Sequence, residues 1–219
     1  QLDELGYGDD FVTIVDPMEF SQRETYAEEL FQLRQRKGLT RAEARELLTH
    51  RHYLGPMMVR MGDADGLIGG LVHKYADTIR PALQTIGLDA KARLVAGTYM
   101  MVFKRELMFF ADPVINIDPS AEELAEIALC TAETARSFDV EPRVAMLSFS
   151  NFGSSRHPQA DKVRQATKIV RDRAPDLMVE GEMQVDLALT PSMLEETYPF
   201  AELTGRANVL IFPDLSSAN

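Results

Sequence analysis

Serine hydroxyls and one arginine gather in a short stretch of the sequence, at a spacing suited to binding an anion. They follow an apolar run from Val144 to Phe149, which is typical of a strand buried on both faces of a parallel sheet. Pro158 then predicts the first turn of a helix. Hydroxyl groups, a helix N-terminus and a positive charge would together hold a phosphate or carboxylate, and an ordinary strand-to-helix loop is the alternative. The candidate ligands are Ser148, Ser150, Ser154, Ser155 and Arg156.

Other basic residues fall in or beside predicted loops and helix ends, where two or three of them could hold a phosphate together. Arg80 is the most informative, because Pro81 follows it and proline is tolerated only in the first turn of a helix. We therefore predict that Arg80 lies near a helix start, where a bound anion would explain its charge; a surface arginine is the alternative. The full set is Arg34, Arg36, Lys37, Arg60, Arg80 and Arg156.

The sequence offers no comparable signal for a metal centre or a covalent nucleophile. The four histidines, at positions 50, 52, 73 and 157, lack the spacing of a zinc site, and His50 and His52 could pair only on a strand or loop. The single cysteine, Cys130, lies in an apolar helical pattern and is predicted to be a small core residue. We therefore assign no metal ligand and no catalytic residue.

These side chains must be positioned by an alternating series of helices and strands, which predicts an α/β fold with parallel pairing. Capping boxes begin the helices at residues 40 and 120. The predicted helices span 21–37, 40–48, 77–85, 120–138 and 158–173. The predicted strands span 11–15, 57–61, 67–72, 94–103, 107–111, 144–149, 177–179 and 208–212, with a hairpin turn at 62–66.

Length and composition limit the classes of function. The 219 residues suffice for one large or two small domains, and the net charge of −11 argues against a nucleic-acid-binding surface. No apolar run has the length of a membrane span, and one cysteine suits a reducing, cytoplasmic setting. The last predicted strand leads into a polar loop after which a helix is expected, so we expect a piece of a longer polypeptide.

Six segments, in order along the chain, resemble the phosphate acetyl/butyryltransferase (phosphotransacetylase) family. The resemblance implies two α/β subdomains with mostly parallel sheets and flanking helices, here 1–92 and 93–219, with a ligand cleft between them and usually a dimer. It also implies acetyl exchange between coenzyme A and phosphate. Arg34 and Arg80 match family arginines that hold phosphate or coenzyme A, and the serine loop would lie in the cleft. The segments are 33–38, 79–84, 132–136, 144–158, 181–184 and 207–215.

Two departures from the family pattern matter. The family's catalytic Ser-Arg pair and its aspartate would lie beyond Asn219. In addition, residues 73–76 read His-Lys-Tyr-Ala where small hydroxyl residues are usual, and with 99–104 and 151–152 they look more like the C-terminal domain of bacterial hybrid malic enzymes. That resemblance implies a domain that binds acetyl-CoA as an allosteric regulator and supports oligomerisation, with NADP and a divalent metal confined to the malate-decarboxylating part. A phosphate acetyltransferase is the alternative, and a scaffold that only dimerises is a third.

Overall fold

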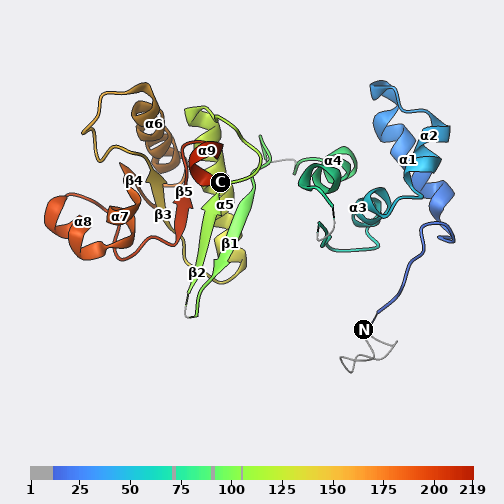
Figure 1. Cartoon of the computed structure of the whole chain (residues 1–219), viewed down its shortest axis with the longest axis horizontal. Coiled ribbons are helices and arrows are strands. Elements are labelled where there is room, and N and C mark those ends of the chain that lie inside the picture. Colours follow the sequence, from blue (N-terminus) through green and yellow to red (C-terminus); the bar gives the residue numbers. More distant parts are fainter. Residues whose placement is uncertain (1–11, 71–72, 90–91, 105) are drawn as a thin grey trace. The chain divides into compact units, whose positions relative to one another are not determined.

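The computed structural model describes residues 12–70, 73–89, 92–104 and 106–219, which form two compact units (Figure 1). Unit 1 spans Gln1–Ala90 and unit 2 spans Lys91–Asn219. In the described parts of the chain, no helix is both long and apolar enough to cross a membrane.

The regular elements of unit 1 are all helices within its described residues. Gly38, with a φ of 92°, ends the first helical stretch in the left-handed conformation that glycine adopts without strain. The capping box predicted at Thr40 is present, since Thr40 Oγ1 accepts from the Glu43 N–H and the Glu43 carboxylate accepts from the Thr40 N–H. The elements are α1 (Arg23–Arg34), the short 3-10 helix η3 (Gln35–Lys37), α2 (Arg41–Leu47), α3 (Arg51–Met61) and α4 (Tyr75–Thr85).

None of the three strands predicted in unit 1 is present within the described residues, and the core of the unit explains the error at 57–61. Residues 57–61 belong to α3, and Met57 on that helix is fully buried beside Tyr26 and Leu30 of α1. A short apolar run fits a buried helix as well as a strand, and tertiary packing decides between them. Gly62, predicted in a hairpin turn, is the left-handed residue that ends α3. Residues 12–15 and 67–70 are not strands either; residues 11, 71 and 72 of those predictions lie outside the described residues.

The position of Arg80 also differs from the prediction. Helix α4 begins at Tyr75, so Pro81 lies inside the helix and Arg80 is not near its start. Pro81 is buried, and its carbonyl accepts a hydrogen bond from Thr85 Oγ1 at 2.9 Å. The prediction that Arg80 lies near a helix start is therefore wrong.

Unit 2 contains a five-stranded sheet in the order β1-β2-β5-β3-β4. The pairs β2–β5, β5–β3 and β3–β4 are parallel, as predicted, whereas β1 pairs antiparallel with β2 at one edge. The unit is thus an α/β fold with a mostly parallel, mixed sheet. The strands are β1 (Thr98–Val102), β2 (Leu107–Ala111), β3 (Arg143–Leu147), β4 (Met178–Met183) and β5 (Val209–Ile211).

Helices cover both faces of this sheet (Figure 1). The long helices α5 (Ala121–Ser137) and α6 (Pro158–Arg173) pack together over one face, with Val163, Val144 and Val209 in their shared core. The short helices α7 (Val185–Leu189) and α8 (Pro191–Thr197) cover the other face, where Leu187 and Leu194 meet Leu210. A last short helix, α9 (Leu215–Ala218), follows β5. The chain leaving β3 therefore turns to one face and the chain leaving β4 to the other.

Candidate functional site

The serine loop, residues 148–157, lies where sheet topology favours a ligand site. It leaves the carboxyl end of β3 and enters α6, while the neighbouring strand β4 continues into α7 on the opposite face. Adjacent parallel strands whose connections turn to opposite faces leave a crevice at their carboxyl ends, and ligands of open α/β sheets bind there. The predicted strand, loop and helix are all confirmed, with the strand ending at Leu147.

The loop is held by one buried carboxylate, Glu182 of β4. Glu182 Oε1 accepts hydrogen bonds from Ser150 Oγ at 2.9 Å and from the Gly153 N–H at 2.9 Å. Arg164 of α6 donates to both carboxylate oxygens, at 2.9 and 2.8 Å. The Phe152 N–H completes the set by donating to the Glu182 carbonyl at 2.9 Å. One fully buried side chain thus ties together the β3 loop, β4 and α6.

These contacts also set the ionisation of the carboxyl group. Burial alone would raise the pKa of Glu182, but the Arg164 guanidinium, the Gly153 N–H and the Ser150 hydroxyl more than offset it and lower the pKa below its ordinary value. The same pairing raises the pKa of Arg164. The pair is therefore charged at neutral pH and acts as a fixed support.

The predicted serines have different surroundings within the loop. Ser150 is buried, and its hydroxyl both donates to Glu182 and accepts from the Ser155 N–H at 3.0 Å. Ser154 Oγ lies 3.2 Å from Ser150 Oγ and accepts from the Asn151 N–H at 3.0 Å, and Ser148 Oγ accepts from the Ser150 N–H at 3.2 Å. Ser150 is thus a positioning residue with no hydrogen-bonding capacity left for a ligand.

The capacity for binding lies at the outer side of the loop. Arg156 is exposed, and neither its guanidinium nor the half-buried Ser155 hydroxyl has a hydrogen-bond or ion-pair partner within the described part of the chain. At the start of α6, His157 Nδ1 accepts from the Gln159 N–H at 3.2 Å. The Ser148 and Ser155 hydroxyls and the Arg156 guanidinium therefore retain hydrogen-bond donors that the described part of the chain does not use.

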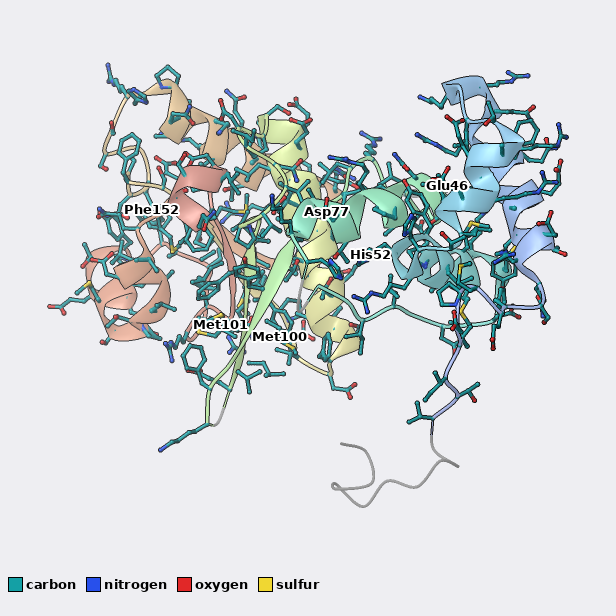
Figure 2. All side chains as sticks on the ribbon, turned by 45° about the vertical axis from the view of Figure 1, so that its right-hand side comes forward. Glu46, His52, Asp77, Met100, Met101 and Phe152 are labelled. Atoms are coloured by element: carbon teal, nitrogen blue, oxygen red, sulfur yellow. The ribbon has the colours of Figure 1, made fainter. Side chains whose placement is uncertain are left out.

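Arg34 and Arg80, the other two predicted ligands, belong to unit 1, whereas the loop belongs to unit 2. Arg34 is half-buried at the C-terminal end of α1. Arg80 is exposed on α4 and lines a cavity of about 180 Å³ with His52 and Asp77. Figure 2 labels His52 and Asp77. Among the residues that the structure describes, neither arginine has an ion pair.

Sequence reasoning gave no role to the residues that build the loop, chiefly Glu182, Arg164 and Gln184. Gln184 pairs side chain to side chain with Asn151 at 2.7 Å, and its own N–H donates to Asn151 Oδ1 at 2.6 Å. Glu182 lies after the predicted strand 177–179, and it is buried because β4 extends to Met183, so the predicted strands contained no signal of a buried charge that must find a partner. No cluster of three or more metal-ligating side chains occurs in the described ranges. Cys130 is half-buried, and burial raises the pKa of its thiol.

The fold and the loop define an open α/β protein with a hydroxyl-rich loop at the carboxyl edge of its parallel strands. The sequence profile described as "Phosphate acetyl/butaryl transferase" matches residues 3–219. The chain belongs to this family.

Named relatives and solved structures agree with this assignment. The chain is 43% identical over 208 residues to the phosphate acetyltransferase of Bacillus subtilis, covering 95% of the chain and 64% of that protein. It is 43% identical to the phosphate acetyltransferase of Synechocystis, covering 95% of the chain but 30% of that protein. A crystal structure of a phosphotransacetylase from Streptococcus pyogenes superposes with a TM-score of 0.89 at 43% identity, covering all of this chain and 67% of that one. The chain thus spans between about a third and two thirds of its relatives' length.

Proposed function

We propose that the protein containing this chain transfers an acetyl group between coenzyme A and phosphate, and that this chain supplies part of the site for both substrates. The relatives named phosphate acetyltransferase support this reading over the malic-enzyme reading. The observation that carries the proposal is the family match over residues 3–219. Arg34, Arg80 and Arg156, which have no ion pair among the residues that the structure describes, are the cations that we assign to the substrates.

The chemistry asks for positive charge and hydrogen-bond donors rather than a covalent nucleophile. A phosphate oxygen attacks the thioester carbonyl carbon, the carbon–sulfur bond breaks, and the coenzyme A thiolate leaves and takes up a proton. Cations and N–H groups stabilise the oxyanion that develops on the carbonyl oxygen. In this proposal Arg156, Ser148 and Ser155 face the substrates, Arg34 and Arg80 hold phosphate groups, and Ser150 and Ser154 shape the loop.

The test is a transferase assay on the full-length protein with acetyl phosphate and coenzyme A. Arg80→Ala should raise KM for coenzyme A about tenfold, equivalent to about 1.4 kcal/mol of binding free energy, and Arg80→Lys should recover part of it. Arg45→Ala is the matched control, since Arg45 is an exposed arginine of the same unit and is paired with Glu24. Absence of acetyl transfer by the wild-type protein would overturn the proposal.

A second candidate is the regulatory domain of a hybrid malic enzyme, with acetyl-CoA as its allosteric ligand. The observation that favours it is the sequence His73-Lys74-Tyr75 before α4, in place of small hydroxyl residues. Two assays on the full-length protein separate the candidates. Malate oxidation with NADP and a divalent metal, measured with and without acetyl-CoA, tests the regulatory role, and robust transferase turnover contradicts a purely regulatory role.

For either function we propose a cytoplasmic location, since one cysteine suits a reducing compartment.

We also propose that the protein forms a homo-oligomer through β1. Four of its five side chains are exposed, including Met100 and Met101 on opposite faces of the strand (Figure 2). The Phe103 N–H donates to the Glu106 carbonyl, so by alternation the main-chain groups of Met100 and Val102 point away from β2.

An edge strand with free main-chain groups, apolar side chains and no charge or proline can pair antiparallel with its own copy about a two-fold axis. The double variant Met100→Lys, Val102→Lys should therefore be monomeric by light scattering. The same mass for the variant and the wild type would contradict the assignment of this strand.

A further inference from the structure

Unit 1 contains a second group of basic side chains that the proposed transferase site does not use. Arg51 and His52, the first two residues of α3, line a cavity of about 280 Å³ with His73 and Thr78. The same three basic residues also line a neighbouring cavity of about 640 Å³, whose other wall is the segment from Ile14 to Pro17.

The three basic side chains are in direct contact. Arg51 Nη2 lies 2.8 Å from His73 Nε2, so the imidazole accepts a hydrogen bond from the guanidinium and must be neutral in this arrangement. The His52 ring stands edge-on to the His73 ring, with the ring centroids 4.2 Å apart. A guanidinium hydrogen-bonded to an imidazole instead of a carboxylate is an unsatisfied cation.

Several charges face His52 and His73 from the elements around them. His50 and Arg51 of α3 and Arg80 of α4 contribute positive charge or can do so, whereas Asp77 of α4 and Asp16 of the 14–17 segment contribute negative charge. The pKa of His52 is lowered mainly by burial and to a smaller extent by repulsion from His73 and Arg51, whereas Asp77 acts to raise it. With the histidines neutral, the two aspartates balance the two arginines, and each imidazole that gains a proton adds one positive charge to the cavity.

Polar main-chain and side-chain groups at the same cavity also lack partners. The N-cap residue of α3, His50, makes no side-chain capping bond, so the Arg51 and His52 N–H groups remain available for an anion, whereas the Tyr53 N–H donates to the His50 carbonyl at 2.9 Å. Thr78 Oγ1 is buried and has no hydrogen-bond partner within the described ranges. The cavity therefore combines a guanidinium, two imidazoles, a hydroxyl and a helix N-terminus.

We propose that this cavity is a binding site for a tetrahedral oxyanion such as a phosphate group, held by Arg51, His52 and His73, and that binding takes up protons. The anion replaces His73 as the hydrogen-bond acceptor of Arg51. Both imidazoles then act as donors to the anion, and their protonated forms bind it more tightly because each adds a positive charge and a second N–H. Affinity consequently falls as pH rises through the range in which histidine loses its proton.

Calorimetric titration of the full-length protein with inorganic sulfate tests the proposal, because sulfate keeps its charge between pH 6 and pH 8. Affinity should fall about tenfold or more over this range through the linked proton uptake. Titrations in two buffers of different ionisation enthalpy should show protons taken up on binding. Inorganic phosphate should bind in the same way, and competition by coenzyme A would identify a phosphate group of that molecule as the ligand.

Three variants make the result specific to this cavity. Arg51→Gln should weaken sulfate binding at least tenfold, whereas His73→Asn, which keeps a hydrogen-bond acceptor, should retain binding and lose most of its pH dependence. Arg45→Gln is the control, because Arg45 is an exposed arginine on α2, and its sulfate binding should equal that of the wild type. If Arg51→Gln folds poorly, Arg51→Lys tests whether the positive charge alone supports binding. No binding at pH 6, or equal binding by Arg51→Gln, would overturn the proposal. None of these measurements depends on acetyl transfer, so the anion site can be disproved without disproving the proposed function, and the proposed function without the anion site.

Discussion

The serine loop of unit 2 and the histidine–arginine cavity of unit 1 handle their polar groups in opposite ways. In the loop, the buried Glu182 carboxylate and the Ser150 hydroxyl have partners for every available position. In the cavity, Arg51 is paired only with the neutral imidazole of His73, and Thr78 Oγ1 has no partner among the described residues. The serine loop therefore has more internal hydrogen bonds than the cavity and fewer unpaired groups that could bind a ligand.

This difference separates a structural role from a binding role. A buried polar group with all its hydrogen bonds stabilises one arrangement of the chain, and its loss is costly. An unpaired cation in a cavity contributes little to folding and is available for an anion. Variants in the loop should therefore lose stability, whereas variants in the cavity should lose a ligand.

The largest effect is expected for Glu182→Ala. Removing this buried carboxylate leaves Ser150 Oγ and the Gly153 N–H without this acceptor and Arg164 paired with Asp161 alone, so the free energy of unfolding of unit 2 should fall by about 3 kcal/mol. Unfolding by denaturant measures this loss of free energy. Glu202→Ala is the matched control, because Glu202 is an exposed acid whose nearest cation lies 3.8 Å away, and a comparable loss in both variants would show that Glu182 has no special role.

The ionisation of Glu182 predicts a specific pH dependence. Its pKa is lower in the folded protein than the unfolded value of about 4.3, so its contribution to stability is complete above that value. As pH falls below about 4.3 toward the folded pKa, the contribution is lost. Unfolding measured at several acidic pH values should therefore show a steeper loss for the wild type than for Glu182→Gln, and parallel curves would contradict this.

A smaller loss is expected when one hydroxyl is removed from the loop. Ser150→Ala leaves the Ser155 N–H and one Glu182 contact unsatisfied in a buried position, which should cost about 2 kcal/mol of unfolding free energy. Ser155→Ala removes a half-buried hydroxyl whose residue bonds only through its N–H, so stability should change by less than about 0.5 kcal/mol. The effects on acetyl transfer should have the opposite order: if Ser155 faces the substrates, Ser155→Ala should reduce activity more than Ser150→Ala does.

Local signals in the sequence predicted unit 2 well. Ser120 begins α5 through a capping box, and Pro158 occupies the first turn of α6, because the free N–H groups of a helix start strongly restrict the residue types found there. The apolar run after residue 143 forms β3, and its parallel neighbours followed from the alternation of elements.

Unit 1 and the support of the loop depend on contacts that local patterns do not contain. The apolar residues 57–61 fit a strand until the packing of Met57 against α1 selects a helix. The meeting of Glu182 with Arg164 and Ser150 requires the register of β3 and β4 and the placement of α6. Likewise, the contact between Arg51 and His73 joins residues 22 positions apart, so their spacing in the sequence gave no sign of a site.

The smallest effect on stability is expected in the cavity, and it gives the sharpest contrast with the loop. Arg51 is exposed and has no acidic partner in the described ranges, so Arg51→Gln should change the unfolding free energy by less than about 0.5 kcal/mol without added anions. A ligand that binds only the folded state at ten times its Kd stabilises it by about 1.4 kcal/mol. Added sulfate at pH 6 should therefore raise the thermal midpoint of the wild type but not that of Arg51→Gln, and sodium chloride at equal ionic strength controls for general salt effects. Equal stabilisation of both proteins by sulfate would mean that the cavity holds no anion and that the contrast between the two regions is one of packing alone.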